Sequence, residues 1–191
     1  MDTITFRIES TAPLLMQAET LANPLHELTK AHKAVSGKRK KSEDDYLWLM
    51  QSEWSASMYY ADDIGPYLPS LNLEGCIAEA GKIHRLGKTI KQAIQVLSDR
   101  AKLEYDGPRK MDKLWQAGSK FADVRGVNVG GKKIMRCRPI FLKWAAEFDV
   151  GFMGDVIDRA DLTRVVEEAG RRIGIGTYRP RFGRFTVQVK Q

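Results

Sequence analysis

The sequence has 191 residues, of which 43% are hydrophobic; this suits one globular domain with a sizeable core and argues against two full domains. The net charge of +7 is spread unevenly, because Glu43–Lys82 holds eight acids and one base whereas Pro108–Lys143 holds ten bases and two acids. Such asymmetry favours an anionic partner. With no apolar run of about 18 residues and no signal-peptide pattern, we expect a cytoplasmic protein without a membrane partner.

The first expected element is a β-strand at the N-terminus, where TITFRIES places Ile4, Phe6 and Ile8 on one face and polar residues on the other. Prolines interrupt the segment that follows, and residues 33–42 are interpreted as a basic loop. This loop is either a solvated turn or a mobile basic finger over a nucleic-acid strand. Its candidate binding residues are Lys38, Arg39, Lys40 and Lys41.

Two helices are expected next. Ser42 and Asp45 resemble a capping box, so one helix begins just after Ser42. Asn72 is expected to cap the other helix, which buries Cys76, and Gly87 marks a break after it. From Asp99 the chain shows no strong period, and residues 88–132 are interpreted as a long central insertion.

The two cysteines, Cys76 and Cys137, lie far apart and belong to no CxxC motif or Cys/His pair. Neither a disulfide framework nor a zinc site is therefore expected, and a reducing compartment is the simplest setting. The sequence also lacks the common phosphate-loop and metalloprotease motifs. We assign no catalytic residue, no metal and no cofactor.

The C-terminal third gives the clearest pattern. Apolar residues alternate over Leu142–Phe152, which predicts a strand, and the spacing from Leu162 to Ile173 predicts an amphipathic helix capped by Asp158 or Asp161. A last strand is expected from Phe185. Together with the first strand and an early helix, this gives an α+β fold, a ferredoxin-like (RRM-like) βαββαβ core with a long central insertion in a single domain, residues 1–191.

A glycine-rich and arginine-rich loop, GIGTYRPRFGRF, joins the last expected helix to the last strand. Gly174 and Gly176 are explained either by the turn alone or by backbone N–H groups that bind phosphate. Gly183 interrupts a strand pattern, which indicates close approach of another backbone. Arginine binds phosphate through two hydrogen bonds, and Tyr178 and Phe182 are the candidates for base stacking. The candidate nucleic-acid-binding residues outside the basic loop are Arg136, Arg138, Gly174, Gly176, Tyr178, Arg179, Arg181, Phe182, Gly183 and Arg184.

This loop and a second stretch, LPSLNLEGCIAEA at Leu68–Ala80, resemble the RAMP superfamily of RNA-binding proteins in CRISPR effector complexes. In its backbone subunits, which line up along a guide RNA, the first helix opens with P-x-S-x-L-x-G-x-x-R-x-A. Pro69, Gly75 and Ala80 fit this pattern, whereas Ala78 or Glu79 replaces the usual arginine. The resemblance implies binding of single-stranded RNA, self-association and contacts with other effector subunits.

The departures from the family pattern bear on catalysis. Cleaving backbone subunits use an aspartate after the first strand, and the nearest counterpart here is Ala22. Processing endonucleases of the superfamily often use a histidine, and this chain offers His26, His32 and His84. Each of these is more readily explained as a surface or packing histidine than as a general base.

The leading hypothesis is a non-catalytic binder of single-stranded nucleic acid, RNA rather than DNA, that oligomerises along the strand. A small stand-alone version is typical of a phage or other mobile element, acting in the cytoplasm of a bacterial host cell. The alternatives are a metal-independent endoribonuclease of the same superfamily, and a phage virion or assembly protein whose segregated charges serve protein contacts.

Overall fold

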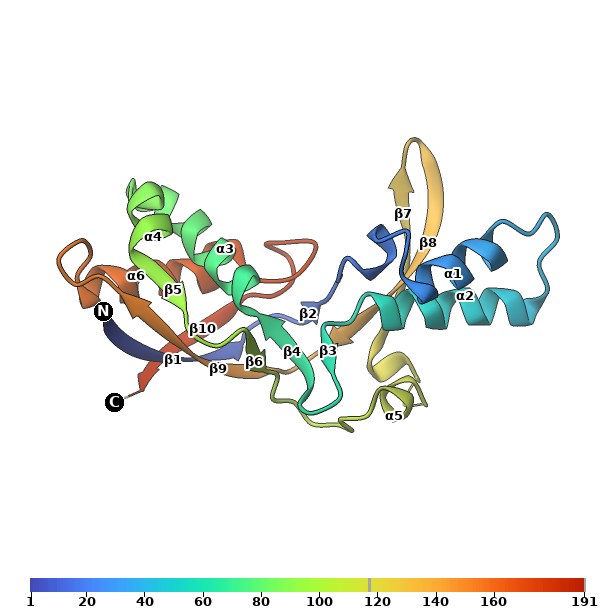
Figure 1. Cartoon of the computed structure of the whole chain (residues 1–191), viewed down its shortest axis with the longest axis horizontal. Coiled ribbons are helices and arrows are strands. Elements are labelled where there is room, and N and C mark those ends of the chain that lie inside the picture. The colour runs from blue at the N-terminus through green and yellow to red at the C-terminus, as the bar shows by residue number, and fades with distance from the viewer. Residues whose placement is uncertain (117, 191) are drawn as a thin grey trace.

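A four-stranded antiparallel sheet forms the core of the protein (Figure 1). The computed structural model describes residues 1–116 and 118–190 of the chain. The strands follow the order β10-β1-β9-β5 across the sheet, and every neighbouring pair is antiparallel. Their bounds are β1 (Asp2–Ser10), β5 (Ile94–Val96), β9 (Ala145–Phe152) and β10 (Phe185–Lys190).

Two helices connect these strands and cover the same face of the sheet (Figure 1). Helix α3 (Ser70–Gly81) lies between β1 and β5 in the chain, and α6 (Arg159–Glu168) lies between β9 and β10. A π-helical turn, η4 (Ala169–Ile173), extends α6. The order β1-α3-β5-β9-α6-β10 is βαββαβ, so the ferredoxin-like fold expected from the sequence is confirmed.

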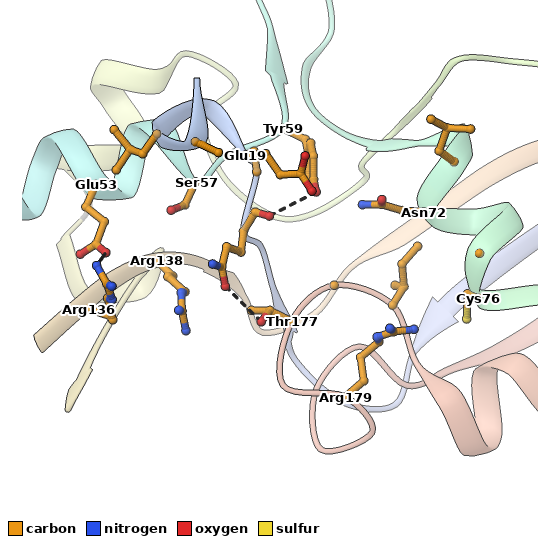
Figure 2. Close-up of a pocket in the computed structure, with 18 of the residues that line it drawn as sticks. Glu19, Glu53, Ser57, Tyr59, Asn72, Cys76, Arg136, Arg138, Thr177 and Arg179 are labelled. Carbon is orange, nitrogen blue, oxygen red and sulfur yellow. Dashed lines mark hydrogen bonds and ion pairs between the residues drawn. The ribbon is translucent and has the colours of Figure 1, made fainter. Parts of the chain in front are cut away.

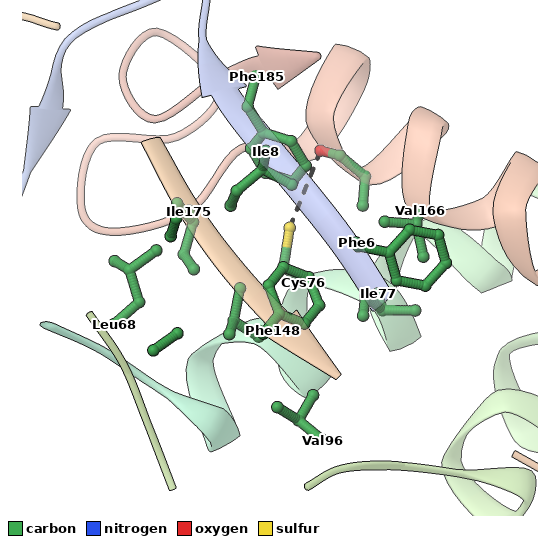
Figure 3. Packing of buried hydrophobic residues seen from close by; sticks show 14 of the residues in the cluster. Phe6, Ile8, Leu68, Cys76, Ile77, Val96, Phe148, Val166, Ile175 and Phe185 are labelled. Atoms are coloured by element: carbon green, nitrogen blue, oxygen red, sulfur yellow. Dashed lines mark hydrogen bonds between the residues drawn. The ribbon is translucent and has the colours of Figure 1, made fainter. Parts of the chain in front are cut away.

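Alternation along β1 builds the core, because Ile4, Phe6 and Ile8 all point to the helical face and are almost completely buried. Phe6 packs against Phe148 of β9 with ring centroids 6.0 Å apart. Figure 3 shows Cys76 of α3 among these side chains, and burial raises the pKa of its thiol to about 12. Cys76 is therefore a core residue, as the helical spacing indicated.

The first addition to the core lies between β1 and α3. It contains an antiparallel pair of helices that extends away from the sheet (Figure 1). The capping box expected at Ser42 is present, because Ser42 Oγ accepts from Asp45 N and the Asp45 carboxylate accepts from Ser42 N. The elements of this addition are β2 (Leu14–Leu15), η1 (Thr20–Ala22), α1 (Glu27–Ser36), α2 (Glu43–Ala56), β3 (Tyr60–Ala61) and β4 (Gly65–Pro69).

The second addition lies between β5 and β9 and ends in a long hairpin that projects from the molecule (Figure 1). This hairpin joins β7 and β8, and β8 also pairs with β2. A smaller sheet, β3-β4-β6, links the two additions. The elements are β6 (Arg100–Lys102), α5 (Met111–Gln116), η3 (Gly118–Lys120), β7 (Ala122–Val129) and β8 (Lys132–Phe141).

The structure corrects the bounds of two predicted segments. The expected insertion 88–132 includes β5, an edge strand of the core sheet, so the addition begins only after Val96. It also ends later than expected, because β8 extends to Phe141. The expected basic loop 33–42 begins too early, since α1 continues through Ser36. The strand β5 has only three residues, and most residues of β7 are at least partly exposed. Neither strand therefore shows a strong hydrophobic period in the sequence.

Other element boundaries also differ from the prediction. Pro69, in an extended conformation, precedes the first turn of α3, so Asn72 lies inside the helix and does not cap it. The strand expected over Leu142–Phe152 begins at Ala145, because the chain turns after β8 and leaves Leu142 58% exposed. The expected break near Gly87 is confirmed, since η2 (Lys82–His84) ends α3 and α4 (Gly87–Ala93) begins at Gly87. Within the described ranges, every helix is too short or too polar to cross a membrane.

A histidine joins the two helices of the first addition. The Nδ1 atom of His32 in α1 lies 2.8 Å from Oγ of Ser52 in α2, and the ring centroids of His32 and Trp48 are 6.3 Å apart. Burial lowers the pKa of His32, with a smaller opposing effect from Glu53 and a smaller reinforcing effect from Arg136. The folded state therefore favours the neutral imidazole.

We expect this histidine to make stability fall as pH is lowered. Below the unfolded-state pKa of about 6.5, the unfolded chain binds a proton that folded His32 resists, so the contribution present at pH 7.5 is lost toward pH 5.5. The His32→Gln variant should have a flatter melting temperature over this range. The Lys30→Gln control, at an exposed position of α1, should keep the wild-type slope, and an unchanged slope in His32→Gln would contradict the assignment.

Candidate nucleic-acid interface

A cleft of about 660 Å³ lies between the core and the two additions (Figure 2). One wall consists of α3 and the glycine-rich loop, Gly174–Phe185. The other wall consists of α2, β8 and the segment that follows β2. Four of its lining residues belong to the set predicted from the sequence, namely Arg136, Arg138, Gly176 and Arg179.

The short strand β2 fixes the two walls relative to each other. Its Leu14 and Leu15 pair with Phe141 and Ile140 of β8 on one side. On the other side, the glycine-rich loop is bound through its backbone, because Thr177 N donates to Leu15 O at 2.9 Å and Gly183 N donates to Pro13 O at 2.8 Å. The segment Pro13–Leu15 thus connects both sides of the cleft by main-chain hydrogen bonds.

Arg138 is the most unusual residue of the cleft. It is only 7% exposed, and its Nη1 atom is buried without a hydrogen-bond partner in the described chain. Its guanidinium carbon lies 5.2 Å from the ring centroid of Tyr178, a cation–π contact. Figure 2 shows the side chain extending from β8. A buried guanidinium without a carboxylate is unfavourable unless an anion binds it.

Arg136 and Arg179 differ from Arg138 because each already has an acidic partner. Arg136 Nη1 lies 2.7 Å from Glu53 Oε1, and the other oxygen of Glu53 accepts from the backbone N–H of Cys137 at 3.0 Å. Arg179 Nη1 lies 3.2 Å from Glu79 Oε2, and both of these side chains are more than a third exposed. The Arg179 pair is therefore weak and open to exchange for a phosphate.

The remaining arginines of the loop, Arg181 and Arg184, are exposed. Neither forms an ion pair within the described residues, and neither lines the cleft. Tyr178 is 42% exposed at the tip of the loop, in a left-handed conformation with φ of 55°. Its ring also lies 5.9 Å from the guanidinium carbon of Arg125 on β7. The loop tip thus contacts the hairpin.

The stacking role expected for Phe182 is wrong. This residue is only 7% exposed and forms a small apolar cluster with Leu15 and Ile140. The loop folds back on β2, and this turns the ring toward the protein interior, where it also lies 4.9 Å from the Arg125 guanidinium carbon. Phe182 therefore holds the loop in place.

The glycines of the loop serve its own fold, which corrects the role expected for Gly183. A Cβ at Gly183 would overlap the carbonyl oxygen of Ile175, and Gly183 precedes β10 rather than interrupting it. At Gly174 and Gly176, a Cβ would lie 2.7 Å from Phe182 O and 2.5 Å from Leu15 O. All three residues have positive φ. The backbone approaching Gly183 is the protein's own.

The basic loop lies away from the cleft, at the outer end of the α1–α2 pair (Figure 1). Lys38 Nζ is 2.6 Å from Asp45 Oδ1, and Lys41 Nζ donates to Lys38 O at 2.7 Å. Arg39 and Lys40 are exposed. The structure thus brings three predicted arginines together and leaves the Lys38–Lys41 run elsewhere on the surface.

Several polar residues of the cleft were missed by sequence reasoning. Gln17, Ser57, Asn72 and Thr177 line it, and Thr177 Oγ1 donates to Gln17 Oε1 at 3.3 Å. These residues belong to four separate segments, so no local motif marks them. Asn72 was recognised in the sequence as a polar residue at the start of a helix, but this position was interpreted as a helix cap.

None of the three histidines lines the cleft in the described chain. His26 Nδ1 caps α1 by accepting from Leu28 N at 3.2 Å, and His32 binds Ser52. His84 has a buried Nε2 atom without a partner among the described residues, but it lies in η2 beyond α3. Across 1–116 and 118–190, no group of three or more histidine, cysteine or acidic residues is arranged to hold a metal ion.

No protein-family model and no curated protein matches the chain. Among solved structures, the fold is similar to a chain of the cryo-EM structure of the Type III-B Cmr-beta bound to cognate target RNA. The TM-score is 0.56 at 12% identity, and the alignment covers 98% of this chain and 60% of the Cmr-beta chain. The protein therefore spans about 60% of that chain's length. At this identity the likeness concerns the fold alone, and it agrees with the ferredoxin-like core described above.

The Gly183→Ala variant should lose stability because its Cβ meets the Ile175 carbonyl and its φ of 74° is unfavourable for alanine. We expect a loss of about 2–3 kcal/mol, seen as a melting temperature lower by several degrees. The matched control is Gly130→Ala in the β7–β8 turn, which has a φ of 55° but no atom within 4 Å of the added Cβ. Equal melting temperatures for the two variants would show that the overlap at Gly183 is relieved without cost.

Proposed function

We propose that this protein binds single-stranded RNA in the cleft and serves as a non-catalytic subunit of a CRISPR-type effector complex. The observation that carries the proposal is the buried, unpartnered Nη1 of Arg138 in the cleft wall. A guanidinium in this position is stabilised by an anion with two oxygen acceptors, and a phosphodiester provides them.

The neighbouring arginines extend this anion site. Arg136 and Arg138 are two residues apart on β8 and so lie on the same face of the strand, while Arg179 approaches from the opposite wall. Glu53 holds Arg136 in place, and the exposed Glu79 is a weak competitor for Arg179. A strand that runs along the cleft therefore meets cations from both walls.

Two features favour RNA over DNA. Asn72, Thr177 and Gln17 place neutral donors and acceptors beside the arginines, and such groups can bind a 2′-hydroxyl. The fold likeness is to a chain of an assembly bound to target RNA. We propose that Tyr178, which is 42% exposed and lies 5.2 Å from the guanidinium carbon of Arg138, stacks on a base.

Binding without cleavage is proposed because the cleft offers no general base of the kind that the endoribonuclease alternative requires. The three histidines of the chain lie outside the described cleft lining. Ala22 lines the cleft where the family pattern places an aspartate, so a methyl group occupies that position. Incubation with labelled RNA should give no products, and bands that disappear in His84→Ala would support the enzyme instead.

We expect RNA affinity to be dominated by phosphate contacts, so that log affinity falls linearly with log salt. Arg138→Gln and Arg179→Gln should each weaken binding and reduce the magnitude of the salt slope by about 0.7, the value for one phosphate contact on a single strand. The measurement is fluorescence anisotropy of a labelled oligouridylate at several salt concentrations.

The matched control is Arg164→Gln on α6, which removes an exposed arginine outside the cleft. Because Nη1 of Arg138 has no hydrogen-bond partner in the described chain, Arg138→Gln loses none there, and circular dichroism should show a native fold. Wild-type affinity and slope in both folded cleft variants would move the RNA site elsewhere.

Self-association along the strand is part of the same proposal. We infer its contact surface from the acids that remain exposed in the folded protein. Much of the acidic segment is already engaged, since Asp45 pairs with Lys38, Glu53 with Arg136 and Glu79 with Arg179. Glu43 and Asp44 remain exposed in the first turn of α2. A neighbour's basic hairpin tip, Lys132 and Lys133, complements them. Such a heterologous contact can repeat along a strand.

Longer oligonucleotides should therefore give larger particles in light scattering at moderate salt. Asp44→Lys should reduce this growth while leaving the affinity for a very short oligonucleotide unchanged, because Asp44 lies outside the cleft. Glu167→Lys on α6 makes the same charge change at another exposed helical position and should assemble normally. A particle mass that is independent of oligonucleotide length would contradict the assembly.

A further inference from the structure

Gly75 lies in the middle of α3, and no contact with the described residues requires it to lack a side chain. The residue is exposed, and a Cβ there would meet no atom within 4 Å. By contrast, a Cβ at Gly81, at the end of the same helix, would lie 2.9 Å from Ile90. A glycine inside a helix is less stable than alanine, and one common reason to keep it is the close approach of a ligand.

The bare backbone at Gly75 lies between two hollows of the surface. It lines the arginine cleft, and it also lines a separate groove of about 200 Å³ between α3, α4 and β5. The exposed stripe of α3 consists of Leu71, Gly75 and Glu79, one turn apart. Without a side chain at its centre, this stripe leaves an open passage from the cleft to the groove.

The groove has a different chemistry from the cleft. Its walls are mainly apolar, and Leu71 at its margin is 76% exposed. Two charged side chains stand at the groove, Glu74 and Lys91. Glu74 Oε1 accepts from Val96 N at 2.8 Å, whereas Oε2 forms no hydrogen bond within the described ranges. The groove thus offers apolar walls with one acceptor and one donor.

We propose that this groove takes an unpaired base of the strand whose phosphates lie in the cleft, and that Gly75 lets the ribose cross α3. The inference rests on the proposed function, since the phosphates are placed by Arg138 and Arg179. In a nucleotide the ribose separates a charged phosphate from a flat, largely apolar base with polar edges. The surface of the protein follows the same order: a cationic cleft for the phosphate, a bare backbone for the ribose, and an apolar groove with polar ends for the base.

The dimensions favour a base over a protein segment. A volume of about 200 Å³ has room for one planar heterocycle but not for a helix or a strand with side chains. Continuity with a cationic cleft also selects an occupant that carries an anion on its other end. The apolar walls bind any base face, while Lys91 and Glu74 contact its hydrogen-bonding edge.

The test compares wild-type protein and Gly75→Leu on two strands of equal length, an oligoadenylate and an abasic ribose phosphate, by fluorescence anisotropy. Wild type should bind the oligoadenylate about tenfold more tightly, the size of one base contact. Gly75→Leu should lose this difference, so that it binds the two strands with about equal affinity. Its melting temperature should match or exceed that of wild type, since leucine favours helix and has room here.

Ala34→Leu is the matched control, because it adds the same side chain to an exposed helical position that lines neither hollow. A folded Gly75→Leu protein with wild-type affinity for the oligoadenylate would overturn the proposal. Equal binding of the two strands by wild type would overturn it as well, while leaving RNA binding in the cleft intact. If wild type binds neither strand, the proposed function fails, and the base site fails with it.

Discussion

The cleft depends on the backbone hydrogen bonds of Pro13–Leu15. This short segment lies between β8 and the glycine-rich loop, and it bonds to both through main-chain groups that no side-chain change can remove. Leu14 and Leu15 are fully buried, so the segment cannot move to water without exposing apolar surface. Because β8 carries Arg138 and the loop carries Arg179, the distance between these cations is set by the position of β2.

This arrangement also explains why net charge is a poor guide to the binding surface. The chain carries an excess of positive charge, yet four of the eight acids in Glu43–Lys82 form ion pairs with arginine or lysine in the folded state, namely Asp45, Glu53, Asp63 and Glu79. Arg138 differs because it lies against the ring of Tyr178 and its Nη1 has no hydrogen-bond partner within the described residues. This lack of an internal partner is a property of the fold rather than of local composition.

Sequence patterns predicted those elements whose causes are local. Alternation fixed β1, the capping box fixed the start of α2, and Asp158 caps α6 as one of two expected residues. The predicted βαββαβ order is confirmed for the core, but its second strand, β5, was not among the strands predicted from the sequence. In contrast, β2 and β5 have two and three residues, and only pairing with distant strands makes them regular. A pattern within the chain cannot report such pairing.

The candidate site was predicted in part for the same reason. Arginine-rich composition singled out Arg138 and Arg179, but it also singled out Lys38 to Lys41, which lie at the far end of the α1–α2 pair. Phe182 looked exposed because its neighbours in sequence are polar, whereas the loop folds back and buries it. Asn72 and Thr177 enter the cleft only once four distant segments meet.

The three glycines of the loop have a consequence for how such proteins diverge. Each is required by an overlap with the protein's own backbone, so selection on the fold alone would preserve them. The arginines between them make few internal contacts, and a descendant that no longer binds an anion could replace them freely. A glycine-rich loop of this kind therefore indicates a shared fold. A related chain that keeps the glycines but loses the arginines has kept the conformation of the loop without the side chains proposed to bind an anion.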